Sequence, residues 1–204
     1  LYLNGTELTE ITVPSSITKI NDYALYGASA ITSVTIPSSV TSIGESAFGG
    51  CSGLTKVNIT DLAAWFKITF GNWYANPLYY AHHLYLHGIE LTEIEIPANI
   101  TKINNFALRG ASAITSITIP NGMTNIGSYA FSGCSELISI TIPESVISIG
   151  ESAFSGCSGL TAVNISDFTA WLNIIFGEFD SNPLTYAHRL YLNGVELTEI
   201  EIPE

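Results

Sequence analysis

The chain repeats itself with a period of 23 residues, and this periodicity constrains its fold more than any other feature. The units follow the pattern Leu/Ile-Thr-x-Ile/Val-x-Ile/Val-Pro, then carry two aliphatic residues spaced by three, and end in Ala-Phe/Leu-x-Gly-Cys/Ala-Ser. The aliphatic-proline pair recurs at Val13-Pro14, Ile36-Pro37, Ile96-Pro97, Ile119-Pro120, Ile142-Pro143 and Ile202-Pro203. A fixed period of this length is typical of solenoid proteins, in which each unit adds one coil.

Two longer units of 37 residues interrupt the array, and they resemble each other closely. Both contain Asp-x-x-Ala-Trp, Asn-Pro-Leu, Tyr-Ala-His and Leu-Tyr-Leu in the same order. The predicted units are therefore 1–7 (partial), 8–30, 31–53, 54–90 (long), 91–113, 114–136, 137–159, 160–196 (long) and 197–204 (partial). We interpret residues 1–204 as a single solenoid segment taken from a longer array.

Within a standard unit, the order of apolar residues predicts short strands and a turn. Residues 33–36 alternate between polar and apolar, as in a strand with one buried face. Val40 and Ile43 predict a second short buried strand, with Gly44 (Asn21 in the first unit) at a left-handed corner. Residues 45–48 then read as one helical or 3-10 turn that directs Ala47 and Phe48 inward.

The long units predict additional elements. Asp61 and Asp167 stand where an N-cap would precede helices at 62–66 and 168–172. Apolar strands follow at 68–70 and 174–176. Asn-Gly pairs at 4–5 and 193–194 predict tight hairpin turns, and His87 weakens that prediction for the middle copy.

Stacked coils would turn each inward position into a ladder along the solenoid axis. One such ladder comprises Leu25, Phe48, Leu108, Phe131 and Phe154. Cys51, Cys134 and Cys157 share a position with Ala28 and Ala111, so we expect small, buried, free thiols there. A metal ligand, a nucleophile or a disulfide between Cys134 and Cys157 is the less favoured interpretation.

The net charge of −12, from 18 acidic and 6 basic residues, disfavours binding to nucleic acids and to anionic lipid surfaces. No apolar run approaches the roughly 18 residues of a membrane helix, so we expect no direct membrane insertion of this segment. The sequence contains no phosphate-binding glycine loop, Walker pattern or nucleophile elbow. We therefore expect no enzymatic activity, no catalytic residues and no cofactor.

The repeat resembles the BspA-like leucine-rich repeats of bacterial, and some protist, surface proteins. The similarity rests on the motif from Ile142 to Ser158, and the long Ala-Trp…Asn-Pro-Leu-x-Tyr-Ala-His unit also occurs in that family. The resemblance implies a right-handed leucine-rich-repeat solenoid of mainly short strands with short helical or 3-10 turns. It also implies a cell-surface or secreted location and a role in adhesion or host-protein binding, without catalytic residues.

Three groups of side chains are candidates for a functional surface. Trp73 and Tyr74 lie where the second long unit has other residues, so they are candidates for a contact patch, whereas Trp65 and Trp171 recur and should be core. The Glu93/Glu95 and Glu199/Glu201 rungs are predicted on the solvent side of strands. Calcium binding there is an alternative to a solvated face. His82, His83 and His87 suggest a metal site, although packing at the coil edge is favoured because no known ligand spacing is completed.

Two functions remain open at this point. The first is a non-catalytic binding module whose partner is an extracellular protein or glycan, since a solenoid presents a long shallow face. The second is a structural stalk or spacer that displays another domain. Open solenoid ends expose apolar edges, so end-to-end association of this segment is a further expectation.

Overall fold

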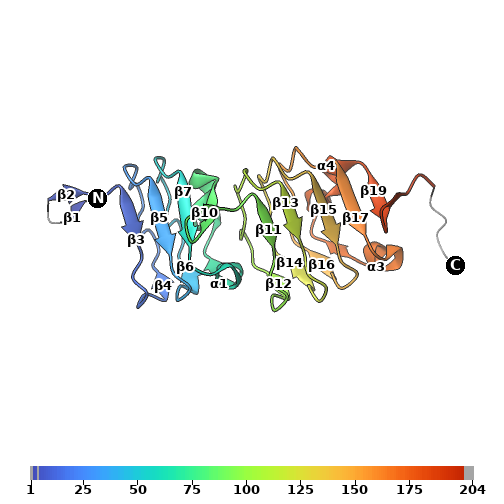
Figure 1. Ribbon diagram of the computed structural model, residues 1–204, viewed down its shortest axis with the longest axis horizontal. Helices are drawn as coiled ribbons and strands as arrows, with labels where there is room; N and C mark the ends of the chain where they lie inside the picture. Colours follow the sequence, from blue (N-terminus) through green and yellow to red (C-terminus); the bar gives the residue numbers. More distant parts are fainter. Residues whose placement is uncertain (1, 4, 200–204) are drawn as a thin grey trace.

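The computed structural model describes residues 2–3 and 5–199 and forms an elongated stack of coils (Figure 1). Each standard unit contributes one strand to a main ladder and one shorter strand to a second ladder. The strands of the main ladder are β3 (Glu10–Thr12), β5 (Ser33–Ile36), β7 (Lys56–Ile59), β9 (Leu84–Leu86), β10 (Ile89–Glu90), β11 (Glu93–Glu95), β13 (Ser116–Thr118), β15 (Ser139–Ile142), β17 (Ala162–Ile165), β19 (Leu190–Leu192) and β20 (Val195–Glu196). The strands of the second ladder are β4 (Lys19–Ile20), β6 (Ser42–Ile43), β8 (Thr69–Phe70), β12 (Lys102–Ile103), β14 (Asn125–Ile126), β16 (Ser148–Ile149) and β18 (Ile175–Phe176).

The strands of neighbouring standard units pair in parallel, in the register that the repeat dictates. Ile11 lies opposite Val34, and Ile117 lies opposite Ile140. In β5 and β7 the second and fourth residues are buried and the other two are half-buried, which confirms the alternation predicted for 33–36. Solenoid coils pair in this way because each inward side chain meets its repeat equivalent in the next coil.

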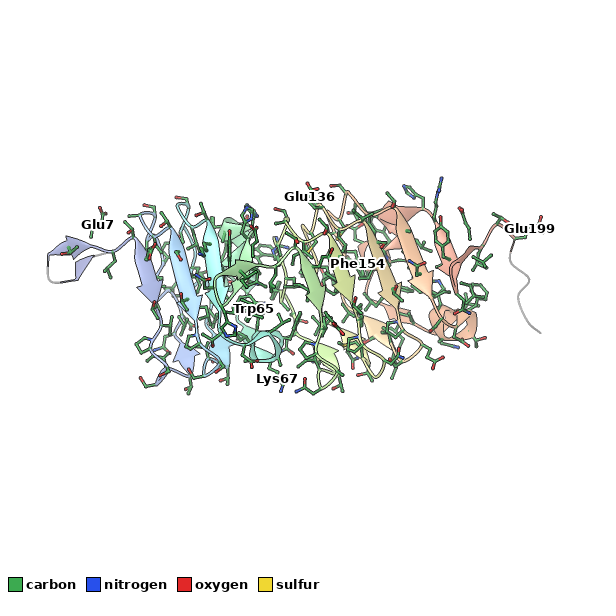
Figure 2. The ribbon with its side chains drawn as sticks, in the orientation of Figure 1. Glu7, Trp65, Lys67, Glu136, Phe154 and Glu199 are labelled. Carbon is green, nitrogen blue, oxygen red and sulfur yellow. The ribbon has the colours of Figure 1, made fainter. Side chains whose placement is uncertain are left out.

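Inward side chains form one hydrophobic cluster that runs from Val13 to Ala187. The predicted ladder is confirmed, because four of its members are buried and the rings of the last two lie 5.3 Å apart. These buried members are Phe48, Leu108, Phe131 and Phe154. Leu25, in the first standard unit, is only partly buried because no earlier standard unit covers it. Figure 2 shows Trp65 and Phe154 inside the stack, where both are buried as predicted.

The corner after the second strand differs from the prediction. Residues 45–50 form hydrogen-bonded turns and no helix. The left-handed residues are Ser46 (φ 50°) and its equivalents, whereas Gly44 and Asn21 do not have positive φ. Gly44 is instead required by close approach, since a Cβ there would lie 2.5 Å from the backbone nitrogen of Asp22 in the preceding coil. The turn is stabilised between coils as well as within them, as in the bond from the Leu25 N–H to the Ala47 carbonyl (2.9 Å).

The long units contain the helices. Asp61 and Asp167 cap α1 (Leu62–Lys67) and α3 (Phe168–Leu172), each accepting a hydrogen bond of 2.6 Å from the backbone of the third helical residue, as predicted. Two 3-10 turns and two short helices follow the strands β8 and β18. They are η1 (Trp73–Ala75), α2 (Leu78–Ala81), η2 (Phe179–Ser181) and α4 (Leu184–Ala187).

Each long unit ends in a two-residue hairpin. His87 and Gly88 adopt φ angles of 51° and 84°, close to the 50° and 82° of Asn193 and Gly194. The hairpin between β9 and β10 therefore forms although histidine replaces asparagine at position 87. The expectation that His87 weakens the hairpin prediction was wrong. The first hairpin joins β1 (Tyr2–Leu3) to β2 (Thr6–Glu7), and its turn residue Asn4 lies outside the described residues.

The hairpins divide the ladders into two blocks, which the repeat pattern did not predict. The first main sheet has the order β10-β9-β7-β5-β3, and the second has the order β11-β13-β15-β17-β19-β20. The second ladder is divided in the same way, into β4-β6-β8 and β12-β14-β16-β18. The antiparallel β10 stands at the edge where a parallel strand would otherwise continue the sheet. The core nevertheless continues across this boundary, where unit 54–90 meets unit 91–113.

Candidate partner-binding surface

We call the boundary between units 54–90 and 91–113 the joint. Side chains of the long unit hold the two units together at the joint by donating hydrogen bonds to backbone carbonyls of unit 91–113. The Trp65 indole nitrogen donates to the Ala107 carbonyl (2.9 Å), and the Asn76 amide donates to the Phe106 carbonyl (2.6 Å). In the other direction, the amide of Asn104 donates to the Ile68 carbonyl (3.1 Å). These bonds replace the strand pairing that is interrupted here.

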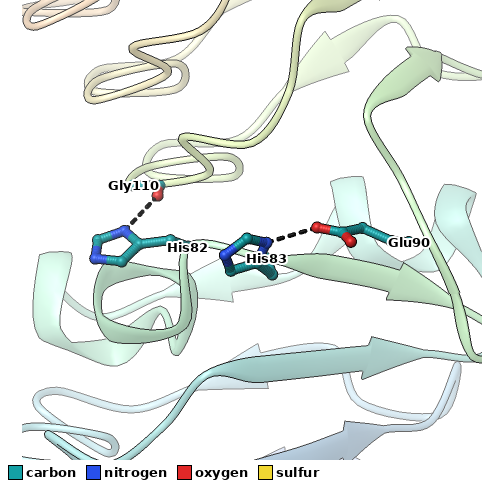
Figure 3. Close-up of polar contacts among 4 residues, drawn as sticks. All are labelled: His82, His83, Glu90 and Gly110. Atoms are coloured by element: carbon teal, nitrogen blue, oxygen red, sulfur yellow. Dashed lines mark hydrogen bonds and ion pairs between the residues drawn. The ribbon is translucent and has the colours of Figure 1, made fainter.

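The histidines of the long unit separate into different roles (Figure 3). His82 is left-handed (φ 61°), and its Nδ1–H donates to the Gly110 carbonyl across the joint (2.8 Å). His83 contacts the Glu90 carboxylate through Nδ1 (2.5 Å), and His87 is exposed in the hairpin turn. Throughout residues 2–3 and 5–199 there is no group of three or more His, Cys, Asp or Glu side chains arranged to hold a metal ion.

Aromatic side chains gather around one arginine at the joint. We call this set the Arg109 cluster. The guanidinium carbon of Arg109 lies 5.2 Å from the ring centre of Trp73, 5.5 Å from that of Tyr79 and 5.3 Å from that of Tyr129. These distances are within the range of cation–π attraction. The surrounding members of the cluster are Tyr74, Tyr80 and Phe106.

The rings of the Arg109 cluster hold one another in place. Tyr74 and Tyr79 meet edge to face at 5.1 Å, and Tyr79 meets Tyr80 at 4.9 Å. Phe106 stacks on Tyr129 at 5.5 Å with an angle of 15° between the rings. Trp73 meets Tyr129 edge to face at 6.2 Å, which joins the long unit to unit 114–136, and Arg109 joins it to unit 91–113. Side chains from three consecutive units therefore brace one another in the cluster.

Arg109 is a partly buried cation with few hydrogen-bond partners. Its Nη1 donates to the Ser132 hydroxyl (3.1 Å), while its Nε is buried without a partner among the described residues. Burial lowers the pKa of Arg109, and the neighbouring tyrosines Tyr79, Tyr129 and Tyr74 oppose that shift. An arginine side chain stays charged at neutral pH even so.

A hollow of about 500 Å³ opens beside this cation. Its walls include hydroxyl groups, one aromatic ring and the imidazole that crosses the joint. They come from Tyr79, His82, Arg109, Ser112, Ser132 and Ser135. Smaller hollows lie on the α1 side of the joint, next to Lys67 and Asn99.

The structure places the sequence-predicted candidates in different surroundings. Trp73 is 41% exposed and Tyr74 is half-buried, and both belong to the Arg109 cluster. Glu93 and Glu95 are exposed on β11 and do not line the hollow. Glu199 is exposed in a bend and not in a strand, and Glu201 lies outside the described residues.

Sequence reasoning missed Arg109, Tyr79 and Tyr129. A signal was available for Arg109, because the same repeat position holds Tyr26, Gly49, Ser132 or Ser155 in the other standard units. An arginine at a position that is uncharged in the other standard units, and that lies next to a long unit rich in aromatic residues, indicates a local function. The second long unit has no comparable set, since Asp180 and Thr185 replace Tyr74 and Tyr79.

The cysteines are buried and free, as predicted from their repeat position. Burial raises the pKa of the Cys157 thiol to about 12, and it raises the pKa of Cys134 as well. Because the thiolate is the reactive form of cysteine, these side chains act as small apolar core residues.

Comparison with known proteins defines the class first: the chain is a leucine-rich-repeat protein. A family model described as the BspA type leucine rich repeat region matches six copies, over residues 2–72 and 82–187. The chain therefore belongs to the family of BspA-type leucine-rich-repeat proteins. A search of curated protein sequences found no match. No catalytic family is indicated.

Solved structures of bacterial leucine-rich-repeat proteins are similar to the chain. A leucine-rich-repeat protein from T. pallidum is 22% identical, with 84% of this chain and 70% of that chain covered and a TM-score of 0.36. A leucine-rich-repeat protein from Bacteroides ovatus is 21% identical, with coverages of 83% and 51% and a TM-score of 0.43. The pneumococcal vaccine antigen PcpA is 16% identical, with coverages of 77% and 62% and a TM-score of 0.42. The chain thus spans only about half of the Bacteroides ovatus structure.

The described part of the chain contains no helix that is long and apolar enough to cross a membrane.

Proposed function

We propose that the chain is a non-catalytic module of a cell-surface or secreted bacterial protein, and that it binds an extracellular protein through the Arg109 cluster. The observation that carries this proposal is the composition of that cluster. Trp, Tyr and Arg are the residues that contribute most often to binding energy at protein interfaces. Here they are joined in one partly exposed and well-braced group.

The location of the cluster supports the same function. Its residues come from a long unit and from the two coils that follow, so a partner would contact a surface that needs little ordering on binding. Adhesion to host or matrix proteins and export to the cell surface are the finer parts of this proposal, and they are supported by the family resemblance.

A structural spacer is the second candidate function, and the threonine rows favour it. Thr32 and Thr55 each donate a side-chain hydrogen bond to a carbonyl one coil earlier (3.1 and 3.2 Å), and Thr115 does the same in the second block (3.1 Å). Bonds that tie successive coils together would stiffen the stack, as a stalk requires.

Surface plasmon resonance against a panel of immobilised matrix proteins (collagen, laminin and fibronectin) tests the proposal. Trp73→Ala should weaken binding by about tenfold or more, as expected for a central aromatic contact. Phe179→Ala is the matched control, because Phe179 occupies the same position in the second long unit and is 75% exposed there. Circular dichroism checks that both variants fold.

Two results would contradict binding through the cluster. If Trp73→Ala and Tyr79→Ala both left the affinity unchanged, another surface would be responsible. If the wild-type chain bound none of the panel, a spacer function would be favoured.

A further inference from the structure

We propose that the hollow beside Arg109 binds a carboxylate-bearing sugar of the uronic or sialic acid class. This inference goes beyond the proposed function, because the ligand is a small acidic carbohydrate and not a protein surface. The two sites share Arg109 and Tyr79, so the experiments below are chosen to separate them.

The first argument is an unbalanced charge. The chain has 18 acidic residues and 6 lysines and arginines, yet neither of the ion pairs in the described part of the chain includes Arg109. Those pairs are His83 with Glu90 and Arg189 with Glu196. A partly desolvated guanidinium gains from a carboxylate partner, which it can bind through two parallel hydrogen bonds.

The aromatic rings explain why this cation is tolerated without a counter-charge. Their faces provide cation–π attraction from Trp73, Tyr79 and Tyr129, and the Ser132 hydroxyl accepts one hydrogen bond. Since that is the only hydrogen bond of the guanidinium to the described residues, the other Nη hydrogens have no protein acceptor there. They are the donors that the ligand carboxylate would use.

The second argument is the chemistry of the walls. Ser112 and Ser135 occupy the same repeat position in consecutive coils, so their hydroxyls follow one another along the solenoid axis. A hydroxyl both donates and accepts, which suits the hydroxyl groups of a sugar. Tyr79 adds an aromatic ring to the apolar part of the wall and a phenol hydroxyl to its polar part. A simple anion would use the arginine alone and would leave these groups without a partner.

The third argument is the size of the hollow. Its volume of about 500 Å³ lies within the range of small-molecule sites. The bond from His82 Nδ1–H to the Gly110 carbonyl fixes the wall where the two blocks meet (Figure 3). The hollow is therefore built by the joint, and no standard unit forms it alone.

Trp73 provides a reporter for the test, because it lies against Arg109 while Trp65 and Trp171 are buried. Tryptophan fluorescence is followed while the chain is titrated with glucuronic acid or with the methyl glycoside of N-acetylneuraminic acid. Glucose and acetate are the matched probes, which lack the carboxylate and the sugar, respectively. Saturation-transfer NMR gives a second readout that does not depend on tryptophan.

The proposal predicts saturable binding of at least one acidic sugar, with a dissociation constant of about 1–10 mM. Glucose and acetate should bind at least about tenfold more weakly. Arg109→Gln should abolish binding of the acidic sugar, whereas Arg189→Gln, at an exposed arginine outside the joint, should leave it unchanged. Ser135→Leu, which places a bulky side chain in the hollow, tests the site without removing the cation.

Several results would overturn the proposal. These are no saturation by either acidic sugar, equal binding of glucose, equal binding of acetate, or full binding by either Arg109→Gln or Ser135→Leu. After such a result the proposed protein-binding function would still stand, provided that Trp73→Ala weakened attachment to a matrix protein. Conversely, sugar binding without any matrix-protein binding would support the hollow and contradict the proposed function.

Discussion

Replacing Asn76 by alanine should destabilise the chain far more than the same change at its repeat equivalent, Asn182. The Asn76 side chain is fully buried, and its amide donates to the Phe106 carbonyl across the joint (2.6 Å). Its Oδ1 also accepts a hydrogen bond from the Leu78 backbone (2.9 Å). Asn182 makes the second of these bonds, to Leu184 (2.9 Å), but its amide has no acceptor among the described residues.

The magnitude follows from the groups that lose a partner. A buried donor or acceptor left without a hydrogen bond costs about 1–3 kcal/mol. Asn76→Ala leaves the buried Leu78 N–H in that state, and it removes one of the two hydrogen bonds of the Phe106 carbonyl, which still accepts from the Arg109 backbone N–H (3.0 Å). The free energy of unfolding should therefore fall by about 2–4 kcal/mol. Asn182→Ala leaves one half-buried group and should cost about 1 kcal/mol.

Urea unfolding, followed by far-ultraviolet circular dichroism and by tryptophan fluorescence, measures the difference. We expect the midpoint of Asn76→Ala to be the lower of the two. Its unfolding curve should also broaden or divide into two transitions, because the blocks on either side of the joint are less strongly coupled. Equal losses for the two variants would refute the reasoning, since they would show that only the bond within the loop contributes.

Two further predictions concern the core. Phe131→Ala should reduce the free energy of unfolding by about 3–5 kcal/mol in a thermal or urea melt, since it removes a fully buried ring that packs on Phe154; an unchanged melting temperature would contradict this placement. Because the pKa of Cys157 rises from 9.0 to about 12 on folding, the thiol should not alter the pH dependence below pH 9, and stability should fall as the pH rises from 9 towards 12. The loss attributable to Cys157 should reach about 2 kcal/mol at about pH 10.5. In Cys157→Ala the free energy of unfolding should fall by that much less between pH 9 and pH 10.5; an unchanged loss would exclude this thiol as its source.

Much of the fold could be predicted because every repeat has apolar residues at the same positions, and those residues must be buried in each coil. The alternation in residues 33–36 and the recurrence of Phe131 and Phe154 each indicate a buried position. Asp61 and Asp167 could be identified as caps because an acidic residue precedes an apolar run in both long units. These predictions depend on local pattern and on one-coil stacking, and the structure confirms them.

The division into blocks and the Arg109 cluster could not be predicted in the same way. Both depend on how a long unit meets the unit that follows it, and the 23-residue period contains no information about that contact. Trp73 and Tyr74 were identified because they differ between the two long units. Arg109 and Tyr129 became part of the same surface only when three consecutive coils were placed in space.

The exchange of the tryptophan indole protons with solvent tests the closed joint most directly. Nitrogen-15 NMR resolves Trp65, Trp73 and Trp171 in one spectrum after transfer to deuterated water. The Trp65 indole proton, buried and bonded to the Ala107 carbonyl, should exchange slowest and only through opening of the joint. The Trp73 proton should exchange fastest; if the Trp65 proton exchanged equally fast, the two blocks would not share a closed core.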